Sequence, residues 1–153
     1  MVIYASTTFG SIFGGYLSSW LITRGWTPLK SRKSVLLAFA FLELCILATR
    51  YADNAWTAVA IISLAVAVHQ AWATNIFTLA TDLFPKHQVS SVVGIGGMAG
   101  SLGGIAFPLL VGWILETHQA VGNLTGGYNL IFTICSLTYL FAWLMIHLLT
   151  RKA

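Results

Sequence analysis

The stretch GIGGMAGSLGG, Gly94 to Gly104, decides how the rest of the sequence is interpreted. Its opening letters, GIGGMA, fit the G-x-G-x-x-G/A fingerprint of dinucleotide-binding turns, and Glu116 lies about 20 residues on, where that fingerprint expects an acidic residue. Glycines at helical spacing are also typical of surfaces where two membrane helices touch. The stretch is therefore either a phosphate-binding turn or a helix-packing surface, and its surroundings decide between the two.

The composition is that of a membrane protein. Hydrophobic residues make up 58% of the 153 residues and charged residues only 8%, whereas soluble domains carry roughly a quarter charged residues. The mean hydropathy is +0.83. Such a chain cannot cover its outer surface with groups that water solvates, so its solvent is lipid. The net charge of +4 comes from basic residues in short clusters between apolar runs, which argues against nucleic-acid binding.

Apolar runs long enough to cross a membrane recur along the chain. A membrane helix needs about 20 mostly apolar residues. Turn-forming or charged stretches separate the runs, namely RGWTPLKSRK, RYADNA, TDLFPKHQ and ETHQAVGNLTGG. The sequence therefore predicts an all-α, polytopic membrane protein whose five transmembrane helices cover about 2–23, 35–51, 56–79, 92–115 and 128–149.

The position of the glycine stretch answers the opening question. It lies inside the fourth apolar run, where neither the strand nor the soluble crossover unit of a dinucleotide-binding turn can form. Gly96, Gly100 and Gly104 repeat at the four-residue interval that follows one helix face, and Gly10 and Gly14 repeat it in the first run. These residues are predicted to form helix-packing surfaces.

Polar side chains follow one face of the third predicted helix. Ser63, Gln70, Thr74 and Thr81 fall on one side at 100° per residue. His69, Trp72 and Asn75 lie near mid-depth on the other faces. Polar groups in hydrocarbon either line a cavity or bond to neighbouring helices. Hydroxyl groups favour bonds to their own helix, the amides of Gln70 and Asn75 favour the cavity, and His69 fits both.

No enzyme motif or metal site is evident. The sequence has no H-E-x-x-H, C-x-x-C or G-x-S-x-G pattern, and its few carboxylates are scattered. Cys45 and Cys135 lie in apolar runs and indicate neither a disulfide framework nor metal binding. No cofactor is expected. Glu43, in the second run, either carries a proton or makes a structural pairing or neutral hydrogen bond, and its apolar surroundings favour the structural role.

The basic residues predict the orientation in the membrane. If the C-terminus is cytoplasmic, seven of the eight Lys and Arg residues lie on that side and only Arg50 lies outside. This bias follows the positive-inside rule. The C-terminus is predicted to be cytoplasmic in a multi-pass protein of the inner (cytoplasmic) membrane, with the N-terminus outside.

Two longer stretches resemble the major facilitator superfamily of transporters. GGYLSSWLITRGWTPLKSRK resembles the signature loop between the eighth and ninth helices, and Arg24, Arg32 and Lys33 match its basic positions. Ser18 and Ser19 stand where the family has an acidic residue, which weakens the expectation of a salt-bridge latch. DLFPKHQVSSVVGIGGMAGSLGG resembles the junction of the tenth and eleventh helices in the anion:cation symporter branch, most closely in hexuronate transporters.

The resemblance implies most of the C-terminal half of a twelve-helix transporter, as its last five helices, with the N-terminal half absent. It implies proton-coupled symport of sugar acids, such as glucuronate or galacturonate, by alternating access. Gln70, Thr74 and Asn75 would hydrogen-bond the substrate, Trp72 would stack on the sugar ring and His69 would tune the site electrically. The partners would be lipid, the sugar acid, the proton and the missing half. The alternatives are a small membrane scaffold or assembly protein and a nonfunctional fragment of a split transporter gene.

Overall fold

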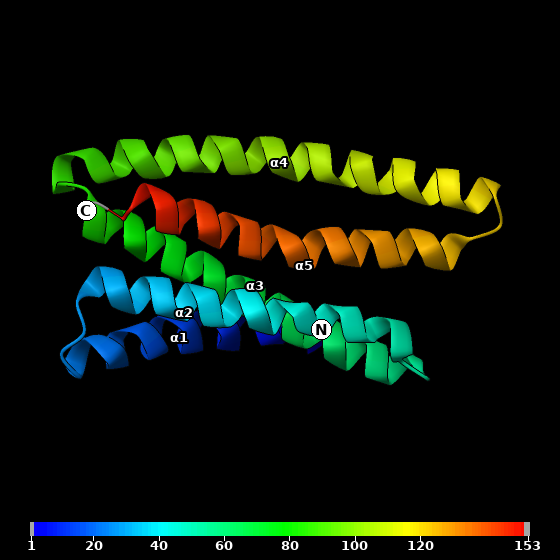
Figure 1. Ribbon diagram of the computed structural model, residues 1–153, viewed down its shortest axis with the longest axis horizontal. Coiled ribbons are helices and arrows are strands. Elements are labelled where there is room, and N and C mark those ends of the chain that lie inside the picture. Colours follow the sequence, from blue (N-terminus) through cyan, green and yellow to red (C-terminus); the bar gives the residue numbers. More distant parts are fainter. Residues whose placement is uncertain (1, 152–153) are drawn as a thin grey trace.

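The chain folds as a bundle of long helices (Figure 1). The computed structural model describes residues 2–151, with side chains from residue 5 onward, and contains no strand within that range. This confirms the all-helical prediction. The elements in chain order are α1 (Val2–Thr23), α2 (Pro28–Glu43), the 3₁₀ helix η1 (Leu44–Tyr51), α3 (Ala55–Leu83), α4 (Lys86–Ala120) and α5 (Leu124–Leu149).

Capping side chains explain why several helices begin where they do. The hydroxyl of Thr27 accepts a hydrogen bond from the backbone of Lys30, and Pro28 occupies the first turn, where its missing N–H has no cost. For this reason α2 begins before residue 35, the predicted start. Asn54 caps α3 and Asn123 caps α5 in the same way. The polar residues that the sequence assigned to loops thus extend the helices.

The closest helix pair is α1 and α3, which lie side by side (Figure 1). Glycines on α1 allow this approach: a Cβ built on Gly14 would lie 2.6 Å from the Cα of Ala71, and one on Gly10 would overlap the backbone of Ala67. The packing predicted for these two glycines is therefore confirmed. The core beside this contact is formed by Val35, Phe39, Val68 and Ala71, with Leu17, Leu21 and Trp72 packed against it.

At one end of the bundle, α2 and α5 are joined by polar contacts. The indole Nε1 of Trp143 donates to the backbone oxygen of Lys33 at 2.8 Å. The Lys33 Nζ donates in return to the oxygens of His147 and Thr150, at 3.5 and 3.4 Å. A cation at the last carbonyls of a helix also interacts favourably with the helix dipole. Lys33, predicted as part of the signature loop, therefore ties the start of α2 to the end of α5.

Replacing Trp143 with Phe tests this link. The change keeps most of the ring contact and removes the N–H donor, so we expect a loss of about 1 kcal/mol of stability. Thermal unfolding of the purified chain in detergent, followed by circular dichroism, measures it. Trp113→Phe is the control, because Trp113 is 63% exposed and its replacement should leave the transition unchanged. Equal effects of the two substitutions would contradict the link.

Helix α4 lies at the edge of the bundle, beside α5 (Figure 1). Its glycines contact no other helix within residues 2–151: a Cβ added at Gly96, Gly100 or Gly104 would meet nothing within 4 Å. The α4 backbone remains helical through Pro108. The packing predicted for these three glycines is therefore not made by the described part of this chain, and it stays a prediction about a partner outside it.

Four helical segments in residues 2–151 are long and apolar enough to cross a membrane: Pro28–Tyr51, Ala55–Leu83, Lys86–Ala120 and Leu124–Leu149. The first of these joins α2 and η1 into one span. Helix α1, with 22 residues, carries more Ser, Thr and Gly and is not among them. The chain is thus a multi-pass membrane protein, and a fifth crossing by α1 stays a prediction.

Candidate functional site

Helix α3 carries all five predicted binding residues. Its backbone packs against α1, α2, η1 and α4, and its side chains reach α5. It packs on α1 with one face and approaches α5 with another. The five candidates, His69, Gln70, Trp72, Thr74 and Asn75, do not converge on one point. Two of them lie on each of these faces, and Gln70 is half-buried.

The face toward α1 holds Asn75 and Thr74. Asn75 is fully buried, and its Nδ2 donates to the backbone oxygens of Gly14 and Ala71, each at 2.9 Å. The hydroxyls of Thr74 and Ser11 are hydrogen-bonded at 3.1 Å. Thr74 also donates to the backbone oxygen of Gln70, as expected for a hydroxyl inside a membrane helix. In this arrangement Asn75 and Thr74 hold α3 to α1.

The face toward α5 holds His69 and Trp72. The Nδ1 of His69 and the hydroxyl of Tyr139 form a hydrogen bond between the two helices. The Trp72 ring meets the Tyr139 ring edge to face, with centroids 5.3 Å apart and planes at 89°. The buried Nε1 of Trp72 has no hydrogen-bond partner among the described residues. The aromatic cluster of His69, Trp72 and Tyr139 thus offers one unused buried donor.

Two neighbouring cavities lie along this aromatic cluster, and we call them together the α3–α5 groove. Their volumes are about 420 and 320 Å³. Both are lined by His69, Thr138 and Tyr139; the first is also lined by Glu43 and the second by Trp72. Apolar walls with a few fixed polar groups are typical of small-molecule sites. The α3–α5 groove is therefore the candidate site that the described residues form.

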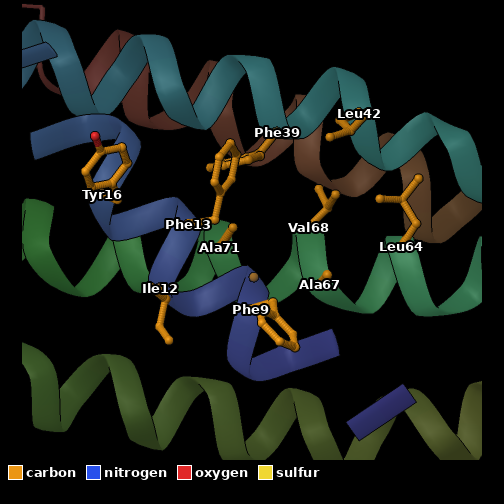
Figure 2. Close-up of a pocket in the computed structure, with 11 residues that line it drawn as sticks. Phe9, Ile12, Phe13, Tyr16, Phe39, Leu42, Leu64, Ala67, Val68 and Ala71 are labelled. Atoms are coloured by element: carbon orange, nitrogen blue, oxygen red, sulfur yellow. The ribbon is translucent and has the colours of Figure 1, made fainter. Parts of the chain in front are cut away.

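A larger cavity, about 530 Å³, lies elsewhere, between α1, α2 and α3 (Figure 2). Aromatic and aliphatic side chains line this cavity, and α1 contributes Phe9, Phe13 and Tyr16 (Figure 2). None of the five candidate residues is among its lining residues. A charged, hydroxylated ligand needs hydrogen-bonding partners in its pocket, which these walls do not supply.

The signature-loop residues form an ion pair after all. The Nε of Arg32 lies 3.1 Å from the Oδ2 of Asp82, at the end of α3, and the guanidinium also donates to the hydroxyl of Ser18. The serines in place of the family's acidic residue weakened the expectation of a latch; the structure corrects this, because α3 supplies the carboxylate. Arg24, by contrast, stacks on Trp20: its guanidinium carbon lies 3.9 Å from the centroid of the Trp20 ring.

Sequence reasoning missed Tyr139 and Asp82. Tyr139 lies in the middle of an apolar run, where a lone phenol is the one signal that a partner is needed. Asp82 lies in TDLFPKHQ, which the sequence predicts to be a connection between helices, but the structure places it in the last turn of α3. Residues 2–151 contain no group of three His, Cys, Asp or Glu side chains that could hold a metal ion.

The chain is a helical, multi-pass membrane protein with a groove between two of its spans, and curated relatives of similar sequence are named as transporters. The hexuronate transporter of Escherichia coli K12 is 31% identical over 110 residues, which are 71% of this chain and 25% of that protein. The probable galactarate/D-glucarate transporter of Bacillus subtilis is 27% identical over 78% of this chain and 25% of its own length. The D-galactonate transporter of E. coli CFT073 is 24% identical over 71% of this chain and 25% of its own length. No family model matches.

The chain is therefore homologous to part of these transporters, which are of the major facilitator type. It spans about a quarter of the length of the curated relatives that it matches. These relatives are named as transporters and not as enzymes.

Proposed function

We propose that these helices form the C-terminal part of a symporter that carries sugar acids, hexuronates such as glucuronate or galacturonate, together with protons by alternating access. A further set of helices, corresponding to the N-terminal half, would complete the transporter. The observation that carries the proposal is the match to relatives named for hexuronate, galactarate or glucarate, and galactonate transport. Each of these substrates is a hydroxylated carboxylate.

The two faces of α3 support different roles in this proposal. His69 and Trp72 line the α3–α5 groove, and Gln70 is half-buried on α3. These three residues are the substrate ligands we favour: an amide and an indole N–H to bond hydroxyl or carboxylate oxygens, and an aromatic face for the sugar ring. The Thr74 hydroxyl and the Asn75 Nδ2 are hydrogen-bonded to α1, so these two residues would position α3 for the ligands.

The exposed α4 glycines support a completing partner. Bare backbone on one helix face permits a close approach by a second membrane helix, and no described helix occupies that face at Gly96, Gly100 and Gly104. We assign this face to helices of the N-terminal half. A scaffold protein would also pack helices there, but nothing in its role would require a polar groove lined by His69, Trp72 and Tyr139.

The ends of the bundle support a cytoplasmic C-terminus. The α1–α2 turn, the α3–α4 turn and the end of α5 lie at the same end (Figure 1). Arg24, Lys30, Arg32, Lys33 and Lys86 are in or beside these turns; Lys152 lies outside the described residues. Positive charge gathered at one end of a membrane bundle is typical of the cytoplasmic side, here of the inner membrane.

Uptake of a labelled hexuronate tests the proposal. Sequencing upstream of the Met1 codon comes first, so that the whole reading frame is expressed in cells that lack hexuronate uptake. We expect uptake in these cells, and Trp72→Phe should reduce it several-fold because the indole donor is lost while the ring remains. Trp56→Phe, at an exposed α3 position outside the groove, is the matched control and should leave uptake unchanged. Absence of uptake of hexuronates, aldonates and aldarates alike, at normal expression, would refute the proposal.

A further inference from the structure

Glu43 is the one acidic side chain buried inside a described membrane span. It is 4% exposed. It is the last residue of α2, and the span continues after it as η1. Its Oε2 has no hydrogen-bond partner among the described residues. The structural pairing that the sequence favoured is therefore not made. A buried carboxyl group without a partner requires another explanation, because an unsatisfied polar group in a membrane span is strongly destabilising.

No cation near Glu43 balances a negative charge. Glu43 lines the cavity of about 420 Å³ in the α3–α5 groove. The titratable groups facing this cavity are His69 from α3 and Cys135 and Tyr139 from α5, while α4 contributes only Phe107; Cys45 follows on η1. No Lys or Arg lines the cavity, and the Arg32–Asp82 pair is the only ion pair within residues 2–151.

His69 does not serve as a fixed counter-ion either. Its Nδ1 is bonded to the Tyr139 hydroxyl, and no contact within ion-pair distance joins it to Glu43. An ionised carboxylate in this place would be buried without an opposite charge, which membrane proteins strongly avoid. A protonated carboxyl group is neutral and leaves only a modest hydrogen-bond deficit. The surroundings thus favour the protonated form.

The cavity also gives the proton a path. A volume of about 420 Å³ is large enough for several water molecules, since one needs only about 10 to 15 Å³ of such space. Water that enters can accept the proton from the Glu43 O–H and solvate the carboxylate that remains. The backbone at Glu43 is, moreover, the junction between α-helix and 3₁₀ helix, and such junctions inside a span often mark hinges.

We propose that Glu43 is a proton-binding site of the C-terminal half: its carboxyl group is protonated at neutral pH, and it exchanges the proton with water through the α3–α5 groove during transport. The proton site itself stands independently of the substrate. Its part in coupling rests on the proposed symport function and would place a proton carrier beside the groove that holds His69 and Trp72.

Infrared spectroscopy of the purified chain in lipid bilayers tests the site without any transport. Ordinary carboxyl groups are ionised at pH 7, so a carbonyl stretch of a protonated carboxylic acid at that pH identifies an unusual one. We expect this band in the unaltered chain, its loss in Glu43→Gln and its retention in Glu116→Gln. Glu116 is the exposed matched control on α4. Glutamine has the shape of protonated glutamate, so a folding defect is not expected, and circular dichroism verifies this.

Two results would overturn the site: no such band in the unaltered chain, or a band that Glu43→Gln leaves unchanged. The coupling role is tested separately in the complete transporter. Glu43→Gln should retain exchange of labelled for unlabelled hexuronate and lose proton-driven accumulation. Accumulation at the unaltered level would refute the role in coupling. If the unaltered transporter moves no sugar acid at all, the proposed function fails while the infrared result on Glu43 still stands.

Discussion

Gly14→Leu is expected to separate α1 from α3 and to destabilise the bundle by about 3 kcal/mol or more. Even a Cβ at this position would lie 2.6 Å from the Cα of Ala71, and backbone cannot move aside as the end of a flexible side chain can. The same displacement would break the hydrogen bond from Asn75 to the Gly14 oxygen, leaving the Asn75 amide only its bond to Ala71 of its own helix. Unfolding of the purified chain by denaturing detergent, followed by circular dichroism, measures the loss.

Gly100→Leu is the matched control. Both glycines lie in four-residue repeats, but a Cβ at Gly100 meets nothing within 4 Å in the described residues, so the isolated chain should change by no more than about 0.5 kcal/mol. In the complete transporter, by contrast, Gly100→Leu should abolish transport, because the added side chain would hold α4 away from the helix of the N-terminal half that packs on this face. Equal stability of the two variants in the isolated chain would contradict the α1–α3 packing described above.

The second large effect is expected from Asp82→Asn. The substitution leaves the Arg32 guanidinium, whose side chain is 10% exposed, facing a neutral amide, with Ser18 as its remaining side-chain partner. Removing one member of a fully buried pair costs about 3 to 5 kcal/mol. The Asp82 side chain is 28% exposed, so water offsets part of the loss and about 2 kcal/mol is expected. The same unfolding assay measures it.

Asp53→Asn provides the control, since Asp53 is exposed in the turn between η1 and α3 and takes part in no ion pair within residues 2–151. A double variant, Arg32→Met with Asp82→Asn, removes both charges. It should be more stable than Asp82→Asn alone, because no unpaired charge remains buried. If Asp82→Asn behaved like Asp53→Asn, the ion pair would contribute nothing to the bundle.

Much of the fold follows from hydrophobic length and glycine spacing. Apolar runs bounded by polar turns predict helices directly, and the close contact at Gly10 and Gly14 follows from their spacing. The helix starts were harder, because Thr27, Asn54 and Asn123 are loop-like in composition yet act as caps. The same spacing at Gly96, Gly100 and Gly104 cannot say which chain supplies the partner helix.

The candidate site was less predictable because a helical period states which residues share a face, but not which neighbour meets that face. Thr74, from the predicted polar face, lies against α1, and its hydroxyl is hydrogen-bonded to the hydroxyl of Ser11. The cavities lie instead on the side of His69 and Trp72, where Tyr139 comes from a helix far along the chain. Glu43 shows the same limit: its burial was predictable, whereas its lack of a partner was not.

The 3₁₀ segment η1 also lengthens its span. A 3₁₀ helix rises about 2.0 Å per residue against 1.5 Å in an α-helix, so the eight residues of η1 reach about 4 Å farther than α-helical residues would. Together with the 16 residues of α2, the segment measures about 40 Å, more than the hydrocarbon core of about 30 Å and close to the full bilayer with its headgroups. We therefore expect Arg50, in the last turn of η1, to reach the depth of the lipid phosphates, where a lone basic residue is well solvated.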